Sequence, residues 1–252
     1  TFVKSLFLDS RDVIINLAAI TDAEASVKNP EEVKENNLGL VNEILSNKNI
    51  RKARKVFLSS TSVYGSQSEF VDESCSDLKP QSPYAESKIE EERLILSASM
   101  PNCVILRLGT IFGVSAGMRF HTAVNKFCFQ AANGLPITVW RTAMDQKRPY
   151  LGLSDACNAI NFFLKHELTD LETFNVVTEN YTVRNIIDTI SRFESEIKIK
   201  FVDSEIMNQL SYEVSSEKLN KLGFRYSDSL VREIEKTLKL LNPKFLKKVQ
   251  IF

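Results

Sequence analysis

Short apolar runs alternate along the chain with longer segments whose apolar residues recur every three or four positions. The runs at 13–19, 55–60 and 104–108 lack polar alternation, which is typical of strands buried on both faces of a parallel sheet. Between them, the segments 31–45 and 84–98 have the helical period. This order of elements predicts an α/β fold in which helices cover both faces of a parallel sheet.

After Gly113 the elements become shorter, which predicts a smaller mixed α/β lobe. Helices are predicted at 119–132, 155–165, 183–192 and 227–241, and strands at 137–139, 174–177 and 197–202. The polar segment from Gly65 to Pro83 contains no predicted element. A loop of that length between a strand and a helix favours a functional segment, with disorder as the alternative.

The composition is that of a globular protein and narrows the choice of function. Of 252 residues, 43% are hydrophobic, and 32 basic residues balance 32 acidic ones. Zero formal charge disfavours a general nucleic-acid binder, because phosphate binding needs a cationic surface. The sequence contains no apolar run long enough to cross a membrane. Four scattered cysteines and two distant histidines predict no metal site and a reducing, cytoplasmic location.

A cluster of hydroxyl side chains, Ser59 to Ser62, ends the predicted strand at 55–60. Open parallel sheets bind ligands beyond the carboxyl ends of their strands, so these hydroxyls are placed to face a substrate. The alternative is that small polar residues only form the turn.

A tyrosine and a lysine four residues apart begin the next predicted helix. Tyr84 and Lys88 share one helix face, and an ammonium beside a phenol favours the phenolate. The pKa of a free tyrosine is about 10, so such a shift brings it toward the range of a general base at neutral pH. Further along the same helix, Glu90, Glu91 and Glu92 are predicted to face solvent.

These motifs occur in an order that resembles the extended short-chain dehydrogenase/reductase family, in its nucleotide-sugar epimerase/dehydratase group. The stretches that carry the resemblance are VIINLAA from Val13, NNLG from Asn36, SSTSVYG from Ser59, PYAESK from Pro83, RLGTIFG from Arg107, RPYLGLSD from Arg148, FNVV from Phe174 with Thr182-Val183, and Ser215 to Phe224. The resemblance implies a Rossmann-like doubly wound sheet in residues 1–113, to which about 148–178 return. It also implies an interleaved substrate-binding lobe, mostly in residues 114–252.

The resemblance further implies roles for single residues. Tyr84 would be the general acid/base, Lys88 its pKa-lowering partner and ribose ligand, and Ser60 the hydroxyl that hydrogen-bonds the reacting oxygen. The implied contacts with NAD or NADP are Leu17, Ala18, Ala19, Asn36, Ser59, Tyr84, Lys88, Leu108 and Gly109. The implied substrate contacts are Thr61, Thr110 and Arg148. Arg148 would face the nucleotide phosphates, which suit a guanidinium group, and a surface ion pair is its alternative.

Two departures from the family pattern bear on the reaction. The family opens with a strand and a GxxGxxG loop that holds the cofactor pyrophosphate, and nothing before Asp9 matches that loop. We therefore expect either a fragment of a longer protein or a product that lacks the first βαβ half. Dehydratases of the group place an acidic pair where this chain has Thr61 and Ser62. This departure disfavours a 4,6-dehydratase and favours an epimerase, a reductase or a dehydrogenase.

The leading hypothesis is an NAD(P)-dependent oxidoreductase or epimerase in which Tyr84 removes a proton from a sugar hydroxyl of a UDP- or dTDP-sugar-like substrate while hydride passes to nicotinamide. One alternative is a non-catalytic or cofactor-deficient binding protein of the same fold. Another is a reductase or dehydrogenase of a non-nucleotide carbonyl compound. The resemblance implies a homodimer through the helices at 31–45 and 84–98, with no nucleic-acid or membrane partner.

Overall fold

The structure, a computed structural model, describes the chain except for residues 1, 24, 68–69, 167–170, 204–210 and 243–252. A four-stranded parallel sheet lies at its centre, in the order β1-β2-β4-β8. Its strands are β1 (Val13–Asn16), β2 (Arg54–Ser60), β4 (Cys103–Leu108) and β8 (Glu172–Val176). The prediction of an α/β fold with a parallel sheet is confirmed.

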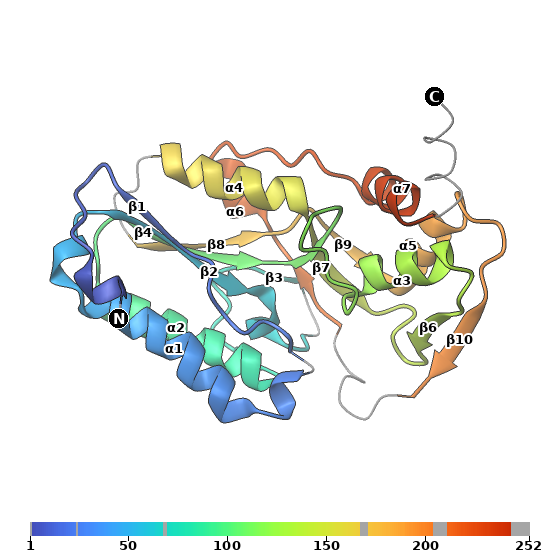
Figure 1. Ribbon diagram of the computed structural model, residues 1–252, viewed down its shortest axis with the longest axis horizontal. Helices are drawn as coiled ribbons and strands as arrows, with labels where there is room; N and C mark the ends of the chain where they lie inside the picture. The colour runs from blue at the N-terminus through green and yellow to red at the C-terminus, as the bar shows by residue number, and fades with distance from the viewer. Residues whose placement is uncertain (1, 24, 68–69, 167–170, 204–210, 243–252) are drawn as a thin grey trace.

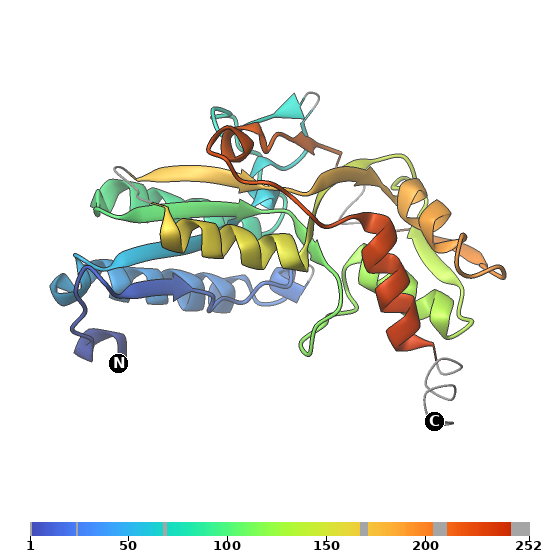
Figure 2. The same cartoon turned by 90° about the horizontal axis from the view of Figure 1, so that it is seen from above.

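Helices cover both faces of this sheet (Figures 1 and 2). Helices α1 (Pro30–Ser46) and α2 (Pro83–Ala98) lie side by side on one face, and α4 (Leu153–Lys165) lies on the other. All three lie within about two residues of the ranges predicted from apolar periodicity. The periodic pattern therefore located the helices that flank the sheet.

The two faces of the sheet explain why its strands are continuously apolar. Val56 and Val104 pack with Phe163 of α4, whereas Phe57 and Ile105 pack with the side of α1 and α2. Successive strand residues point to opposite faces, so both sets must be apolar when helices cover both faces.

The start of α2 is set by local sequence and determines where Tyr84 lies. The Ser82 hydroxyl accepts a hydrogen bond from the backbone N–H of Ala85 at 3.1 Å, and Pro83 occupies the first helical position. Both features favour a helix start at this point. Tyr84 is consequently held in the first turn of α2.

A smaller lobe follows β4. Its strands are β5 (Thr110–Phe112), β6 (Ile137–Trp140), β7 (Lys147–Gly152), β9 (Glu179–Thr182) and β10 (Ile199–Val202), and its helices are α3 (Ala123–Ala132), α5 (Val183–Ile190) and α7 (Leu230–Leu241). The strands form a three-stranded sheet, β5-β7-β9, and a parallel pair, β6-β10. Between these parts of the lobe the chain returns to the main sheet through α4 and β8.

Several elements differ from the prediction. The predicted helix at 119–132 begins only at Ala123, and the one at 227–241 begins at Leu230, after Ser229 caps it. The loop from Gly65 to Pro83 contains a short strand, β3 (Phe70–Val71), which pairs with β11 (Glu213–Val214). The remaining described elements are α6 (Glu217–Lys221) and the 3-10 turns η1 (Phe2–Ser5), η2 (Ala25–Val27), η3 (Lys48–Ile50) and η4 (Thr61–Tyr64).

A fully buried carboxylate ties the main sheet to the C-terminal segment. Asp155, in the first turn of α4, accepts hydrogen bonds from the backbone N–H of Ser227 at 2.7 Å and from the Thr178 hydroxyl at 2.8 Å. The Asp228 carboxylate in turn lies where a Cβ at Gly152 would be, 2.2 Å away. This close approach requires glycine at the junction of β7 and α4.

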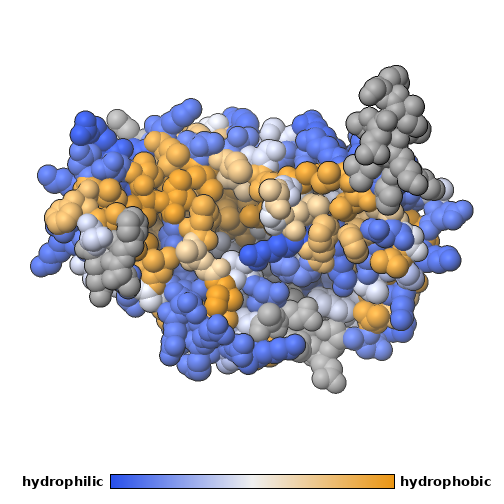
Figure 3. Space-filling view, in the orientation of Figure 1, coloured by the Kyte–Doolittle hydropathy of each residue, from blue (hydrophilic) through white to orange (hydrophobic). Residues whose placement is uncertain are grey.

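The β1 side of the sheet exposes apolar side chains. Val13, Ile15 and Leu17 are 39%, 36% and 66% exposed. Apolar surface gathers over this region in the space-filling view (Figure 3). Within the described part of the chain, β1 pairs with β2 alone, so its other edge keeps free backbone hydrogen-bonding groups. No helix within the described ranges has the length and apolar character needed to cross a bilayer.

Candidate active site

The carboxyl end of β2 presents the predicted hydroxyl cluster. Ser60 ends the strand, and its hydroxyl oxygen accepts hydrogen bonds from the Ser62 backbone N–H at 3.2 Å and the Ser62 hydroxyl at 2.9 Å. The η4 turn that follows ends at Gly65, whose φ is 62°. A Cβ at Gly65 would lie 1.7 Å from the Lys79 carbonyl oxygen, so only glycine fits there.

The structure brings Ser60, Tyr84 and Lys88 together, as the spacing suggested. The hydroxyl of Tyr84 lies near that of Ser60, which lowers the pKa of the phenol against the larger effect of burial. The ammonium of Lys88, one helical turn further along α2, lies 5.9 Å from the centre of the Tyr84 ring. A phenol, a second hydroxyl and an ammonium therefore meet at one end of the sheet, which is the arrangement needed to move a proton at a bound hydroxyl group.

The electrostatics of Tyr84 differ from the expectation. The pKa of Tyr84 is raised to about 12: burial raises it most, the Ser60 hydroxyl lowers it, the charge of Glu91 raises it and the charge of Arg119 lowers it. The sequence predicted a lowered value on the strength of Lys88. Loss of solvent around the phenol outweighs the groups that lower its pKa.

The contacts of Lys88 give a second reason why the pKa of Tyr84 is not lowered as the sequence predicted. Its ammonium donates a hydrogen bond to a Glu91 carboxylate oxygen at 2.9 Å and another to the Leu58 carbonyl oxygen at 3.1 Å. Lys88 and Glu91 are both buried, with 5% of each side chain exposed. The positive charge beside Tyr84 is thus accompanied by a negative charge on the same helix.

The prediction that Glu90, Glu91 and Glu92 face solvent is wrong for two of the three. Glu91 and Glu92 are buried, while Glu90 lies at the surface and forms an ion pair with Lys34 of α1 at 3.0 Å. Carboxylates are rarely buried without a cation, and α2 supplies one partner itself, Lys88 at three residues' distance from Glu91. That spacing was visible in the sequence.

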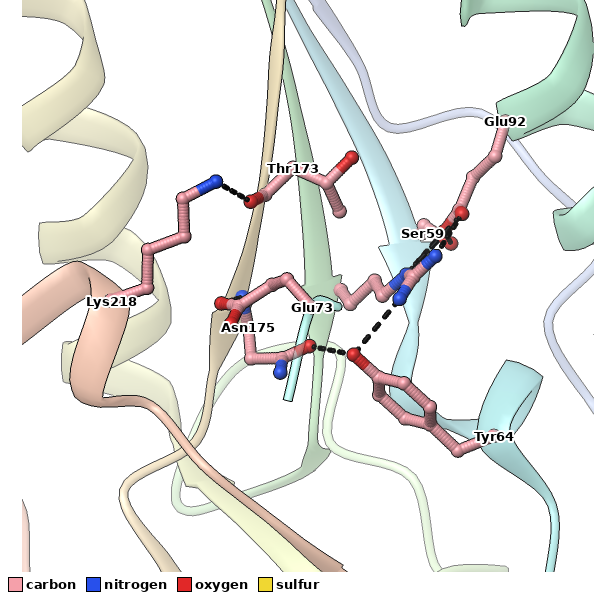
Figure 4. Close-up of polar contacts among 8 residues, drawn as sticks. Ser59, Tyr64, Glu73, Glu92, Thr173, Asn175 and Lys218 are labelled. Carbon is pink, nitrogen blue, oxygen red and sulfur yellow. Dashed lines mark hydrogen bonds and ion pairs between the residues drawn. The ribbon is translucent and has the colours of Figure 1, made fainter. Parts of the chain in front are cut away.

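Glu92 belongs to a separate buried network below the strand ends (Figure 4). Its carboxylate accepts hydrogen bonds from the Arg107 guanidinium at 2.6 and 2.9 Å and from the Ser59 hydroxyl at 2.5 Å. Arg107 also donates to the Tyr64 hydroxyl at 2.9 Å, and Tyr64 donates to the Asn175 side chain at 2.9 Å. Ser59, predicted to contact the cofactor, uses its hydroxyl hydrogen in this network, so its hydroxyl could only accept, and not donate, a hydrogen bond in that contact.

Of two neighbouring asparagines on α1, the structure turns the second toward the site. Asn36, the predicted cofactor neighbour, is exposed and donates a hydrogen bond to the Glu32 carbonyl oxygen of its own helix. Asn37 is buried: it accepts from the Ile20 backbone N–H at 2.8 Å and donates to the Ser87 hydroxyl at 3.3 Å. Adjacent helical residues point about 100° apart, so the motif alone did not settle which of the two faces inward.

The remaining predicted cofactor positions lie at the carboxyl ends of neighbouring strands. Leu17, Ala18 and Ala19 follow β1, and Leu108 and Gly109 lie where β4 ends. The backbone N–H of Gly109 donates to the Val176 carbonyl oxygen at 3.0 Å, and a Cβ there would come within 3.2 Å of the backbone of β7. These positions share one edge of the parallel sheet, where ligands bind in open α/β folds.

The polar atoms at this edge fit the nicotinamide–ribose half of a dinucleotide. Lys88 has acceptors for two of its three N–H groups among the described residues, which leaves one for a ribose hydroxyl. One carboxylate oxygen of Glu91 is buried and has no hydrogen-bond partner in the described part of the chain. The described ranges contain no glycine-rich turn that would hold a pyrophosphate.

The predicted substrate residues lie on two sides of this cluster. Thr61 is buried, donates to the Leu108 carbonyl oxygen at 3.3 Å and lies near the hydroxyl of Tyr212, whose pKa is raised by burial and lowered by Thr61. Arg148 lies on β7, with its guanidinium 5.7 Å from the centre of the Trp140 ring, and its charge lowers the pKa of Tyr212. Thr61 and Arg148 are thus linked through Tyr212.

Thr110 begins β5 and pairs with Tyr150 of β7. Sequence reasoning missed Tyr212 and Arg119, because each lies in an irregular segment far along the chain from Tyr84. Two surface hollows, of about 350 and 280 Å³, lie at the outer side of α2 and at residues 46–49. Neither is lined by Tyr84 or Ser60, which are both half-buried.

Comparison with known proteins gives a family and a fold. The model of the NAD dependent epimerase/dehydratase family matches residues 3–176. UDP-sulfoquinovose synthase from Spinacia oleracea is 29% identical over 126 residues, which are 46% of this chain and 26% of that protein. The chain therefore spans about a quarter of the length of this relative. The dTDP-D-glucose 4,6-dehydratase of Bos taurus is 25% identical, over 97% of this chain and 72% of its own length.

Among solved structures, UDP-glucuronic acid 4-epimerase from Bacillus cereus, in complex with UDP-glucuronic acid and NAD, superposes with a TM-score of 0.82. The match covers 94% of this chain and 76% of that one, at 22% sequence identity. This likeness confirms the predicted Rossmann-like fold.

Proposed function

Since the chain belongs to the NAD-dependent epimerase/dehydratase family, we propose that it carries the proton-transfer machinery of an NAD(P)-dependent epimerase or oxidoreductase that acts on a nucleotide sugar. The observation that supports this most directly is that Ser60, Tyr84 and Lys88 lie together at the carboxyl end of the sheet. The resemblance seen in the sequence is confirmed at the level of the family, which is NAD-dependent by its description.

In the proposed reaction, the Tyr84 oxygen takes the proton of a substrate hydroxyl and returns it later in the cycle. The Ser60 hydroxyl donates a hydrogen bond to the same substrate oxygen and so holds it beside Tyr84. Bound NAD would supply the hydride acceptor. The ammonium of Lys88 would hold a ribose hydroxyl with its remaining N–H and stabilise the phenolate. Positioning of the reacting groups and acid/base assistance would supply most of the rate.

For the substrate we propose a UDP- or dTDP-sugar, bound between the main sheet and the smaller lobe. Arg148, Thr61 and Thr110 would contact it, with the planar guanidinium of Arg148 facing the phosphates. The relatives named above act on UDP- or dTDP-linked sugars, and one was solved with a UDP-sugar. The proposal thus gives the class of substrate, a UDP- or dTDP-sugar, and the class of cofactor, NAD or NADP.

We favour an epimerase or dehydrogenase over a 4,6-dehydratase. Thr61 and Ser62 supply hydroxyls where a dehydratase of this group has carboxylates. Neither hydroxyl can replace a carboxylate as the general base that water elimination requires, since its pKa lies far above neutrality. The likeness to the bovine dehydratase extends over nearly the whole chain, so the distinction rests on these two positions.

A cofactor-deficient binding protein of the same fold is the second candidate. One observation favours it: the pKa of Tyr84 is raised to about 12, so the phenol stays protonated at neutral pH. The expected homodimer through α1 and α2 also stays a prediction. These helices pack against each other within one chain, joined by the Lys34–Glu90 ion pair, and their outer faces are exposed.

The test of the proposed function is Tyr84→Phe. We expect NAD-dependent turnover of a panel of UDP- and dTDP-sugars to fall by about 10²–10⁴-fold, because the proton acceptor is lost. Binding of UDP, followed by calorimetry, should stay within about threefold, since the ring remains and only one hydroxyl is removed.

The matched control is Tyr226→Phe, which removes a hydroxyl that accepts a hydrogen bond from the Val177 backbone N–H, away from Ser60. This variant should retain turnover. Equal turnover in Tyr84→Phe and the wild type would contradict the proposal. Absence of NAD binding by the unaltered chain would favour the binding protein.

A further inference from the structure

We propose that Glu91 is a positioning residue that holds the Lys88 ammonium against the end of β2 and offsets its charge at Tyr84. The proposal rests on the function proposed above. Its starting point is geometry: a carboxylate oxygen of Glu91 lies 2.9 Å from the Lys88 ammonium, both side chains are 5% exposed, and Lys88 also donates to the Leu58 carbonyl oxygen. The ammonium is thus held between two acceptors, one on α2 and one on β2.

The second observation is the unused capacity of Glu91. Its other carboxylate oxygen is buried and accepts no hydrogen bond from the residues that the structure describes. A buried, half-bonded carboxylate destabilises a fold, so an ion pair kept only for stability would normally be bonded more completely. The position of Glu91 beside a functional lysine gives it a different use: it controls how much positive charge reaches the phenol.

Beside the larger effect of burial, the charged and titratable neighbours of Tyr84 change its pKa in both directions. On α2, the charge of Glu91 raises the pKa of Tyr84; from the segment before α3, Arg119 lowers it; and from the segment before β11, Tyr212 raises it. Glu91 itself faces Lys88, which lowers its pKa, and Glu92, which raises it. Burial raises the pKa of Glu91 more than any of these charges changes it.

Removing the negative charge of Glu91 should therefore make Tyr84 easier to ionise. In Glu91→Gln the Lys88 ammonium keeps its carbonyl acceptor on β2, and the negative charge that raises the pKa of Tyr84 is gone. Removing a like charge close to an acid lowers its pKa, here by about one unit. At a given alkaline pH, the fraction of Tyr84 present as phenolate should rise about tenfold.

The experiment is a pH titration of the cofactor-free chain, labelled with ¹³C at the ζ carbon of its six tyrosines and followed by NMR. Tyr84→Phe identifies the signal by its disappearance. The Tyr84 signal of the wild type should keep its phenol position to higher pH than that of Glu91→Gln. The matched control is Glu90→Gln, which removes a surface carboxylate one position away and should titrate like the wild type.

Two further variants keep the test decisive if Glu91→Gln does not fold. Lys88→Gln should delay the ionisation of Tyr84, because Glu91 then acts unopposed. The double variant Lys88→Gln/Glu91→Gln removes both charges of this pair, so its Tyr84 should ionise at a lower pH than the Tyr84 of Lys88→Gln. Identical midpoints within either pair, wild type with Glu91→Gln or Lys88→Gln with the double variant, would overturn the proposal.

This readout needs no NAD, so it separates the two proposals. A shift of the Tyr84 titration in a chain that shows no nicotinamide chemistry would support the role of Glu91 and count against the proposed function. Where turnover is measurable, the acidic limb of the pH–activity profile, where Tyr84 must lose its proton to act as the base, should move to lower pH in Glu91→Gln, a change that a purely structural role does not produce.

Discussion

Two adjacent glutamates on α2 form buried ion pairs that differ in how completely their polar atoms are bonded. Glu92 accepts hydrogen bonds on both carboxylate oxygens, from Arg107 and from Ser59. Glu91 accepts on one oxygen, from Lys88, and its second oxygen has no partner in the described part of the chain. The two residues have the same chemistry and nearly the same burial, so the difference lies in their surroundings.

The closed network extends well beyond its ion pair. Arg107 donates to the Tyr64 hydroxyl, and Tyr64 donates to Asn175 (Figure 4). The Asn175 side chain in turn donates to the Ser215 carbonyl oxygen at 3.0 Å. It therefore joins β4, η4, β8 and the segment before α6. Such fully bonded networks hold a core in a single arrangement.

The open pair lies one residue back along α2, beside Tyr84 and Ser60. Buried polar atoms without partners are few in folded proteins and concentrate where a ligand or a reaction uses them. The contrast indicates a division of work on one helix, in which Glu92 stabilises the sheet and Glu91 acts on the reactive end. Variants that remove one partner at a time should separate these two roles.

The largest effect should come from Arg107→Met. This change leaves the Glu92 carboxylate buried without its guanidinium, and removing one partner of a buried ion pair costs about 3–5 kcal/mol of unfolding free energy. Urea denaturation measures the loss. Arg93→Met, an exposed arginine of the same helix, is the matched control and should change stability by less than about 0.5 kcal/mol.

The double variant Arg107→Met/Glu92→Leu sharpens this result. It removes both charges and restores an apolar contact, and such replacements of buried pairs are often neutral or stabilising. We expect it to recover most of the stability lost in Arg107→Met. A double variant as unstable as the single one would mean that packing, and not the unpaired charge, causes the loss.

A smaller loss should follow Tyr64→Phe. The change removes the hydroxyl between Arg107 and Asn175, and leaving buried polar partners unsatisfied costs about 1–3 kcal/mol. In the Arg107→Met background the same change should cost less, because one of the two partners is already gone. Equal losses in both backgrounds, measured by urea denaturation, would show that the network does not act as a unit.

The same contrast shows what the sequence alone could reveal. Continuous apolar runs and helical periods identified β1, β2, β4 and α2, and the spacing of Tyr84 and Lys88 placed them on one helix face. These signals are local and periodic. The burial of Glu91 and Glu92 is not local: for Glu92 it depends on a guanidinium from β4, which the fold brings beside the helix.

Other features that the sequence did not reveal have the same origin. The choice of Asn37 over Asn36 depends on the rotation of α1 against the sheet, since both residues have the same side chain. The two-residue strands β3 and β11 are paired across more than 140 residues of sequence, so no short window of residues could indicate them. Tyr212 reaches the site through the same long-range pairing.

The smallest expected effect concerns the pH dependence of stability at the open pair. Burial raises the pKa of Glu91, so the folded chain binds this proton more tightly than the unfolded chain does. The stabilisation from the bound proton is complete below the pKa of the unfolded carboxyl group and is lost as the pH rises through the folded value. The glutamine of Glu91→Gln does not titrate, so this variant does not lose stability at this position as the pH rises.

The free energy of unfolding of Glu91→Gln, relative to the wild type, should therefore increase as the pH rises from about 4 to 7, as the linkage relation requires. Urea denaturation at several pH values measures the trend, with Glu90→Gln as the control that should follow the wild type throughout. A relative stability of Glu91→Gln that falls over this range would mean that its carboxylate is better stabilised in the folded chain than in water. The half-bonded state of Glu91 would then carry no electrostatic cost, and that part of the contrast between the open and the closed pair would disappear.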